Sequence, residues 1–283
     1  MTRIGIICKK GKAEPIELLK GLLPWLSERG LTVFVESEAA QNLGIQGYDR
    51  RQLPALVEMI IVLGGDGTML SVARLVAERD IPIFGINLGG LGFITEVSRD
   101  EALDALDKVI AQDYVIEDRM MLHTRVIRQG QPTAEFTVLN DVVINKGALA
   151  RIFDIEIFIE RRYVTTFKAD GLIISTPTGS TGYSLSAGGP ILYPTLHCMV
   201  ITPICSHTLT NRPIVIEDAM LIEARVTPGS KDISLTLDGQ LGEALCEGDV
   251  VEVRRSEHVT RLLLPAQRDY FQILREKLKW GER

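Results

Sequence analysis

The sequence of 283 residues predicts two domains, a parallel, doubly wound α/β domain followed by an all-β domain of sandwich type. From the N-terminus to about residue 118, short apolar β-branched runs alternate with segments of helical periodicity, as in parallel sheets covered by helices. From there to about Pro265, helical periodicity is scarce and β-type runs follow one another at short intervals. The predicted fold class is therefore α/β plus β, with a Rossmann-like N-terminal domain and a β-sandwich C-terminal domain.

The first domain alternates strands and helices. A helix should begin near Pro15, because proline suits the first helical turn. Residues 36–48 are polar and contain glycine, so we expect a loop there. Ser98 and Glu101 form a capping box that should open another helix. The strands of this domain are expected at 3–8, 31–35, 59–62 and 81–86.

The second domain should consist of strands, and the chain should then return to the first. A helix at 267–280 carries Tyr270, Phe271, Leu274 and Leu278 on one stripe, which should pack on the first domain. The predicted domains are thus residues 1–118 plus 266–283, and residues 119–265. Strands of the second domain are expected at 124–127, 136–144, 155–159, 172–175, 214–216, 221–226, 233–237 and 250–253.

The most informative motif is Gly64-Gly65-Asp66-Gly67-Thr68. The apolar run 59–62 precedes it and residues 69–76, with helical spacing, follow it, so the motif lies in a turn from strand to helix. In an open parallel sheet, such turns meet at the carboxyl edge, where ligands bind. Glycine lets backbone N–H groups approach a phosphate, and the helix N-terminus adds a partial positive charge. Asp66 is a candidate base or metal ligand inside this turn.

Other readings of this motif remain open. It could be a plain βα turn in which Asp66 caps the helix, because glycine turns are common. It is neither a Walker A loop, since no Gly-Lys-Ser/Thr follows, nor a G-x-G-x-x-G dinucleotide fingerprint. A second glycine-rich turn at 87–93 follows the strand 81–86 and should lie at the same sheet edge.

Another cluster of candidate binding residues lies in the β domain. Residues 176–190 are dense in glycine and in hydroxyl side chains, which both donate and accept hydrogen bonds. Tyr183 offers an aromatic face for stacking on a base. A serine-rich turn without a ligand is the alternative. Asn140-Asp141, at a strand end, could bind a ribose or an amide, although an Asx turn would explain the pair equally well.

Composition and charge argue against several classes of protein. Hydrophobic residues make up 46% of the chain, enough for large cores, and the net charge of −6 argues against a general nucleic-acid binder. The four cysteines show no C-x-x-C spacing, so we expect neither a zinc site nor a disulfide framework. Four scattered cysteines fit a reducing compartment. We expect a cytoplasmic protein without a signal peptide or a membrane span.

Together these motifs resemble those of the NAD kinase family, from residue 4 to about residue 264. The glycine turn alone is weak evidence, because 6-phosphofructokinases and diacylglycerol or sphingosine kinases carry similar turns. The hydroxyl-rich stretch after Asp-Gly is far more specific. The resemblance rests on Gly64–Thr68, Asn140-Asp141, Asp170-Gly171, Thr178–Ser184 and Asn211-Arg212-Pro213.

The sequence departs from the family pattern at two positions. The usual Asn-Glu pair is Asn140-Asp141 here, which keeps the carboxylate on a shorter arm. The usual Ser-Thr-Ala-Tyr has glycine at position 182, and the missing methyl group is expected to loosen the loop.

The resemblance implies an enzyme that phosphorylates the 2′-hydroxyl of the adenosine ribose of NAD with ATP, giving NADP and ADP. Asp66 would be the general base that activates this hydroxyl, and the glycine turn would hold the donor phosphates. The β domain would form the NAD pocket. The binding positions that the resemblance implies are Asp66, Gly67, Asn140, Asp141, Arg151, Lys168, Asp170, Thr181, Gly182, Tyr183, Ser184, Leu185, Ser186 and Gln240.

The expected partners are ATP and NAD, with no nucleic acid and no membrane. We find no dedicated set of protein metal ligands, so a divalent cation, Mg²⁺, is expected to arrive with ATP. We also expect a homo-oligomer, a dimer or a tetramer.

Two alternative functions stay open at this point. One is a lipid or sugar kinase that shares the glycine turn, although no exposed amphipathic membrane helix is evident. The other is a dinucleotide-binding sensor that kept the pocket and lost catalysis, against which the presence of Asp66 argues.

Overall fold

The chain forms two compact units in the computed structural model, which describes residues 2–146, 152–208, 210–229, 232–266 and 269–280. Unit 1 comprises Met1–Asp118 and Thr260–Arg283, and unit 2 comprises Arg119–Val259. The return to unit 1 falls at Thr260, inside the long strand β17 (Val250–Pro265), whereas the sequence placed it at residue 266.

Unit 1 contains a parallel sheet with the strand order β2-β1-β3-β4. Both β5 and the C-terminal part of β17 pair with β4, the latter through Leu262 opposite Ile83. Every residue of β3 and β4 is buried, because helices cover both faces of the sheet. The strands are β1 (Arg3–Cys8), β2 (Thr32–Val35), β3 (Met59–Leu63), β4 (Ile83–Asn87) and β5 (Val97–Ser98).

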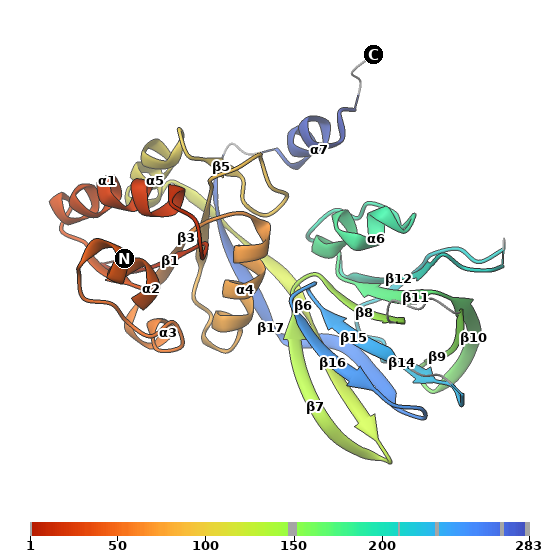
Figure 1. The fold of residues 1–283 in the computed structure, drawn as a ribbon. Coiled ribbons are helices and arrows are strands. Elements are labelled where there is room, and N and C mark those ends of the chain that lie inside the picture. Colours follow the sequence, from red (N-terminus) through yellow and green to blue (C-terminus); the bar gives the residue numbers. More distant parts are fainter. Residues whose placement is uncertain (1, 147–151, 209, 230–231, 267–268, 281–283) are drawn as a thin grey trace. The chain divides into compact units, whose positions relative to one another are not determined.

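Helices α1 (Glu14–Glu28) and α5 (Ala102–Ile110) share one core with one face of this sheet (Figure 1). Gly85 lies between Phe84 and Ile86 of that core, so its Cα faces the other side of the sheet. A methyl group there would lie 3.0 Å from Met69 Sδ of α4 (Asp66–Val76), which therefore packs on that side. No helix among the described residues is long and apolar enough to span a membrane. The other helices of unit 1 are α2 (Ser37–Leu43), α3 (Leu53–Leu56), η1 (Ala77–Arg79) and α7 (Tyr270–Leu278).

The loop predicted at 36–48 is wrong, because α2 occupies Ser37–Leu43. Its fully buried residues are two small ones, Ala39 and Ala40, with Leu43 partly buried beside them, so the apolar face is too narrow to show as a clear periodic pattern. Gly44, with φ of 65°, ends the helix in the left-handed conformation. Glu36 directly precedes α2 and is 3% exposed. Its carboxylate accepts a 2.6 Å hydrogen bond from Cys8 N, and burial raises the pKa of Glu36.

Unit 2 is a sandwich of antiparallel sheets. One sheet has the order β13-β12-β11-β8-β15-β16, and the other contains β10-β9-β14-β17 with the hairpin β6-β7 beside β17. The strands are β6 (Tyr114–Arg128), β7 (Gln131–Val138), β8 (Asp141–Lys146), β9 (Phe153–Ile159), β10 (Arg162–Ala169), β11 (Gly171–Ser175), β12 (Cys198–Ile204), β13 (Ile214–Glu217), β14 (Ile222–Val226), β15 (Ile233–Leu237) and β16 (Leu241–Leu245).

The core of unit 2 lies between its two sheets. It joins Ile144 and Ile174 of the first sheet to Ile157, Ala224 and Val253 of the second. Burial alternates along β14 and β15, as expected of strands with one face in the core. The predicted fold class, α/β plus a β sandwich, is confirmed.

The single strand predicted at 136–144 is divided in the structure. β7 ends at Val138 and β8 begins at Asp141, so Leu139 and Asn140 form a bend between them. The backbone N–H groups of Leu139 and Asn140 turn to the carboxylate of Asp238 instead of continuing a strand ladder.

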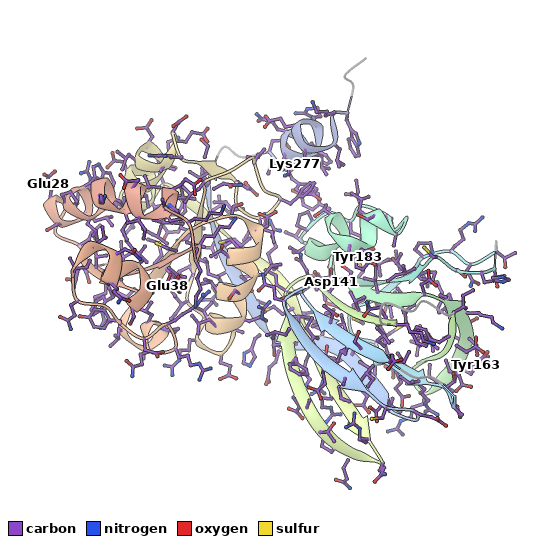
Figure 2. All side chains as sticks on the ribbon, viewed as in Figure 1. Glu28, Glu38, Asp141, Tyr163, Tyr183 and Lys277 are labelled. Carbon is purple, nitrogen blue, oxygen red and sulfur yellow. The ribbon has the colours of Figure 1, made fainter. Side chains whose placement is uncertain are left out.

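The predicted apolar stripe of the last helix is only partly correct. In α7, Ile273 and Leu274 are each 2% exposed, whereas Phe271 is 54% exposed. The aromatic residue is therefore outside the core that the pattern assigned to it. Lys277 projects from α7 (Figure 2). Its Nζ lies 5.5 Å from the ring centroid of Phe93, a cation–π contact with the second glycine turn.

Truncation of the buried side chains of α7 should destabilise unit 1. Leu274→Ala should lower the free energy of unfolding by about 2–5 kcal/mol, because it leaves a cavity. The matched control Phe271→Ala should change it by less than about 0.5 kcal/mol, because that ring is exposed. Urea titration of both variants measures the difference. Equal effects of the two substitutions would contradict the packing of α7 through Leu274.

Candidate functional site

The glycine motif lies between the end of β3 and the start of α4. Gly64 and Gly65 form the turn, and Asp66 is the first residue of the helix. The carbonyl of Gly65 accepts hydrogen bonds from the N–H groups of Thr68 and Met69, at 2.9 and 3.2 Å. A methyl group on Gly64 would lie 2.5 Å from Thr68 Oγ1, so the helix can begin here only after glycine.

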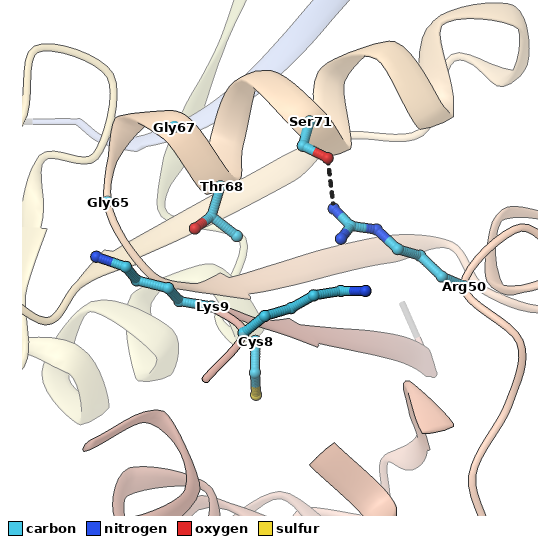
Figure 3. A pocket seen from close by; sticks show the side chains of 8 residues that line it. Cys8, Lys9, Arg50, Gly65, Gly67, Thr68 and Ser71 are labelled. Carbon is cyan, nitrogen blue, oxygen red and sulfur yellow. Dashed lines mark hydrogen bonds between the residues drawn. The ribbon is translucent and has the colours of Figure 1, made fainter. Parts of the chain in front are cut away.

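A cationic pocket of about 260 Å³ lies against this turn. Figure 3 shows Lys9 and Arg50 entering it from opposite sides, beneath the first turns of α4. Arg50 Nη2 donates a 2.9 Å hydrogen bond to Ser71 Oγ, which fixes the guanidinium on the helix. Three cationic side chains next to a helix N-terminus favour an anion of phosphate type. The lining residues are Cys8, Lys9, Lys10, Arg50, Gly65, Gly67, Thr68 and Ser71.

The carboxylate of Asp66 is held by the second glycine turn. Oδ2 accepts a 2.9 Å hydrogen bond from Phe93 N. Oδ1 accepts three, from Ile94 N at 3.2 Å, from Thr95 N at 3.0 Å and from Thr95 Oγ1 at 2.8 Å. The two glycine-rich turns predicted from the sequence therefore meet at this carboxylate, and its two oxygens are used unequally.

Asn140 lies in the bend before β8 and Asp141 is the first residue of β8, and the carboxylate of Asp238 holds both. Asp238 accepts hydrogen bonds from Leu139 N at 3.2 Å, Asn140 N at 2.7 Å and Asp141 N at 3.3 Å. On its other side the bend is held by Thr176, whose Oγ1 donates to the carbonyl of Leu139 at 2.7 Å.

A pocket of about 330 Å³ opens at this bend in unit 2. Asp141 and Tyr183 lie close together there (Figure 2). The amide oxygen Oδ1 of Asn140 is buried and has no hydrogen-bond partner among the described residues, so it is an acceptor available to a ligand. The lining residues are Asn140, Asp141, Val143, Asn145, Tyr183, Thr236, Asp238 and Gly239.

The carboxyl group of Asp141 has an unusual protonation equilibrium. Burial, together with the nearby charge of Asp238, raises the pKa of Asp141 from its usual range to about 7. Close to neutral pH, this side chain can therefore either donate a hydrogen bond to a ligand hydroxyl or accept one.

The hydroxyl-rich stretch folds into η2 (Thr178–Thr181) and α6 (Tyr183–Ser186) after β11. From this stretch, Tyr183 lines the pocket of unit 2, and it is 46% exposed. The hydroxyl of Ser184 is buried and bonds Thr202 Oγ1 at 2.9 Å, and Thr181 Oγ1 donates to the carbonyl of Thr178 at 3.2 Å. Part of the hydroxyl content therefore serves the fold of this stretch.

Gly182 stands beside the two polar residues of the bend. A methyl group there would lie 3.7 Å from Asn140 Nδ2 and 3.8 Å from Asp141 Oδ2, in ordinary contact, and 3.2 Å from the carbonyl of Gly179. The glycine thus leaves open a small space over the amide and the carboxyl group.

The other predicted site residues do not line this pocket. Lys168 on β10 is exposed, Ser186 is exposed, and Leu185 and Asp170 are partly buried. Gln240 is exposed in the turn after Gly239, and Arg151 lies outside the described residues.

Lys9, Lys10 and Arg50 line the cationic pocket but were not predicted from the sequence. Lys9 and Lys10 directly follow β1, so they reach the same carboxyl edge as the glycine turn, and this position was a usable signal. Arg50 carried no such signal, because it lies in an irregular segment before α3. Among the described residues, no group of three His, Cys, Asp or Glu side chains is arranged to hold a metal ion.

Unit 1 thus offers an anion pocket with a carboxylate beside it, and unit 2 a polar pocket with an aromatic face. The first is suited to phosphate chemistry, and the second to hydroxyl and amide groups of a nucleotide.

Comparison with known proteins agrees with these features. The chain matches the ATP-NAD kinase N-terminal domain over residues 4–114 and the ATP-NAD kinase C-terminal domain over residues 139–264. It is 52% identical over 285 residues to an NAD kinase of Syntrophotalea carbinolica and 51% identical over 283 residues to one of Geobacter metallireducens, with 100% of each chain covered.

Two solved structures share the fold. Yeast NADH kinase complexed with NADH has a TM-score of 0.93 at 23% identity, covering 100% of this chain and 89% of the yeast chain. An NAD kinase from Archaeoglobus fulgidus in complex with ATP has a TM-score of 0.79 at 24% identity, covering 98% and 99%. With half of its residues identical to curated NAD kinases over its whole length, the chain belongs to the ATP-NAD kinase family and is a kinase enzyme with NAD kinase function.

Proposed function

We propose that this enzyme transfers the γ-phosphoryl group of ATP to the 2′-hydroxyl of the adenosine ribose of NAD, giving NADP and ADP, with Asp66 as the general base. The observation that carries the assignment is the position of the Asp66 carboxylate at the N-terminus of α4, the helix that also lines the cationic pocket. The same turn of the chain can then bind the donor phosphates and provide the proton acceptor.

The cationic pocket of unit 1 is the proposed site of the ATP phosphates. Lys9, Lys10 and Arg50 neutralise the phosphate charge, and Gly65 leaves the backbone of the turn open to a close approach. Mg²⁺ would be held by the ATP phosphates rather than by protein side chains, and when bound it would supply positive charge next to the transferred group.

Asp66 Oδ2 is the proposed proton acceptor. The 2′-hydroxyl loses its proton to this carboxylate, its oxygen forms the new bond to the γ-phosphorus, and the bond from that phosphorus to the β–γ bridging oxygen breaks, releasing ADP. Because Oδ2 accepts one hydrogen bond from the protein and Oδ1 accepts three, Oδ2 has the free lone pair.

The pocket of unit 2 is the proposed site of NAD. The unpaired amide oxygen of Asn140 supports this, as do the carboxyl group of Asp141 and the ring of Tyr183 in the same lining. The family resemblance adds Gly67, Arg151, Lys168, Asp170, Thr181, Gly182, Ser184, Leu185, Ser186 and Gln240 as further proposed contacts.

We further propose a cytoplasmic homo-oligomer, a dimer or a tetramer. Cys8, Cys198, Cys205 and Cys246 are all free thiols, which fits a reducing compartment. Large apolar side chains such as Tyr163 and Trp280 are more than half exposed, and an interface between subunits would cover them.

Asp66→Asn should lower kcat by about 10²–10⁴-fold, because it removes the positioned base. An amide oxygen can still accept the three hydrogen bonds at Oδ1, so the variant should fold and bind NAD. Asp269→Asn is the matched control, since Asp269 also begins a helix, where it accepts from Phe271 N at 2.9 Å. Turnover near that of the parent in folded Asp66→Asn would overturn the role of Asp66.

The two pockets should separate the two substrates. Asn140→Ala should raise the Kd for NAD, because it removes the acceptor in unit 2, and should leave that for ATP within about twofold. Arg50→Ala should do the reverse, because it removes a phosphate-binding cation. Titration calorimetry of both nucleotides into both variants makes each variant the control for the other. The opposite pairing of losses would mean that the pockets are assigned the wrong way round.

Compared with the parent, Asp141→Asn should be more stable at alkaline pH than it is at acidic pH. Because the pKa of Asp141 is raised to about 7, the parent loses stability as pH rises from about 4 to about 7, where the folded state is penalised for releasing the proton. The shift of about three units sets an upper limit of about 4 kcal/mol. Urea unfolding at pH 5 and pH 8 measures this gain, with exposed Asp232→Asn as control. The same stability difference from the parent at both pH values would contradict the prediction.

A further inference from the structure

Two polar side chains, Asn87 and Thr95, form a hydrogen-bonded chain behind the proposed base. Asn87, the last residue of β4, donates from Nδ2 to Thr95 Oγ1 at 3.0 Å. Thr95 Oγ1 lies 2.8 Å from Asp66 Oδ1. Asn87 and Thr95 are 4% and 0% exposed, so water has little access to replace either contact.

The orientation of the Asn87 amide follows from its other contacts. Its Oδ1 accepts from Gly89 N at 2.9 Å, and its Nδ2 faces the carbonyl of Gly90 at 2.8 Å. A flipped amide would set oxygen against that carbonyl and nitrogen against the N–H group. Nδ2 is therefore the atom that points to Thr95.

The direction of the amide fixes the direction of the hydroxyl. A threonine hydroxyl has one hydrogen to donate, and an amide nitrogen can only donate to it. Thr95 Oγ1 thus accepts from Asn87, and its own hydrogen is directed to Asp66 Oδ1. The result is a one-way relay from Asn87 through Thr95 to Asp66.

We infer that Thr95, oriented by Asn87, is a positioning residue that occupies Oδ1 of Asp66 and leaves Oδ2 as the oxygen that takes the proton. This inference rests on the proposed role of Asp66 as the base. With Oδ1 holding three donors and Oδ2 one, the carboxylate presents one oxygen to the substrate in a fixed plane. Hydrogen bonds to a charged acceptor are stronger than neutral ones, so these donors hold the carboxylate in one orientation.

The packing around the relay blocks other carboxylate positions. A Cβ atom on Gly92 would overlap both Asp66 Oδ1 and Thr95 Oγ1. The backbone of the second glycine turn therefore lies directly against the pair. Gly92 also donates its N–H to the carbonyl of Thr95 at 3.2 Å, which closes the turn around them.

Thr95→Val tests the relay because it keeps the shape of the side chain and removes the hydroxyl. The N–H groups of residues 93–95 still bind Asp66, so the turn should fold. We expect kcat to fall about 10- to 100-fold, with the KM values for ATP and NAD within about twofold. The pH profile of kcat should also differ from that of the parent, because the carboxylate loses the hydroxyl donor at Oδ1.

Two further variants separate positioning from folding. Thr95→Ser restores the hydroxyl and should restore kcat and the pH profile. Thr124→Val is the control for a buried threonine, since Thr124 Oγ1 has no hydrogen-bond partner among the described residues and is 0% exposed. It should leave turnover unchanged. If Thr95→Val does not fold, Thr95→Ala gives the same test, because it also removes the hydroxyl and keeps the N–H group of residue 95 that binds Asp66 Oδ1.

The outcomes distinguish this inference from the proposed function. Parent-like kcat and pH profile in folded Thr95→Val, with Asp66→Asn inactive, would overturn the relay and keep Asp66 as the base. An active Asp66→Asn would overturn the base itself. Loss of activity in both Thr95→Val and Thr95→Ser would show that Thr95 acts through packing, which also contradicts the inference.

Discussion

A carboxylate that accepts several backbone N–H groups holds the proposed ligand-facing loop of each unit. Asp66 accepts from three consecutive residues of the second glycine turn in unit 1. Asp238 accepts from three consecutive residues of the bend before β8 in unit 2. Irregular segments that are partly buried need partners for their N–H groups, and hydrogen bonds to a charged acceptor are stronger than neutral ones. In each unit, one carboxylate therefore pairs the N–H groups of a whole loop.

This arrangement has different electrostatic consequences in the two units. Asp66 lies at the N-terminus of α4, where the partial positive charge of the helix favours a carboxylate. Asp238 lies in a tight turn after β15, with φ of 49°. Burial, and secondarily the charge of Asp238, raises the pKa of Asp141. In unit 2, the buried Asp141 carboxyl group can therefore hold a proton near neutral pH. In unit 1, the pocket is lined by cationic side chains that suit an anionic ligand.

The sequence predicted those features whose signal is local. β15 has the predicted bounds because apolar and polar residues alternate cleanly, and the Gly64–Thr68 turn follows a continuous apolar strand. Features that depend on distant partners were missed. Asn140 donates to Asp238, 98 residues later in the chain, so the bend that divides the strand predicted at 136–144 had no local signal. Likewise, Arg50 reaches the pocket only because Ser71 of α4 anchors it.

Two different physical reasons explain why glycine occupies positions in these motifs, and only one of them concerns a ligand. Gly64 and Gly92 are required by the protein itself, because a Cβ atom would crowd Thr68 in the first case and overlap Asp66 and Thr95 in the second. Gly65 has no such constraint: its nearest atom outside the turn, Asn87 Oδ1, would be 4.0 Å from a Cβ, and its φ of −98° suits any residue. A side chain there would instead fill the cationic pocket that Gly65 lines. The steric argument for a phosphate at this turn therefore depends on Gly65, whereas Gly64 and Gly92 serve the folded chain.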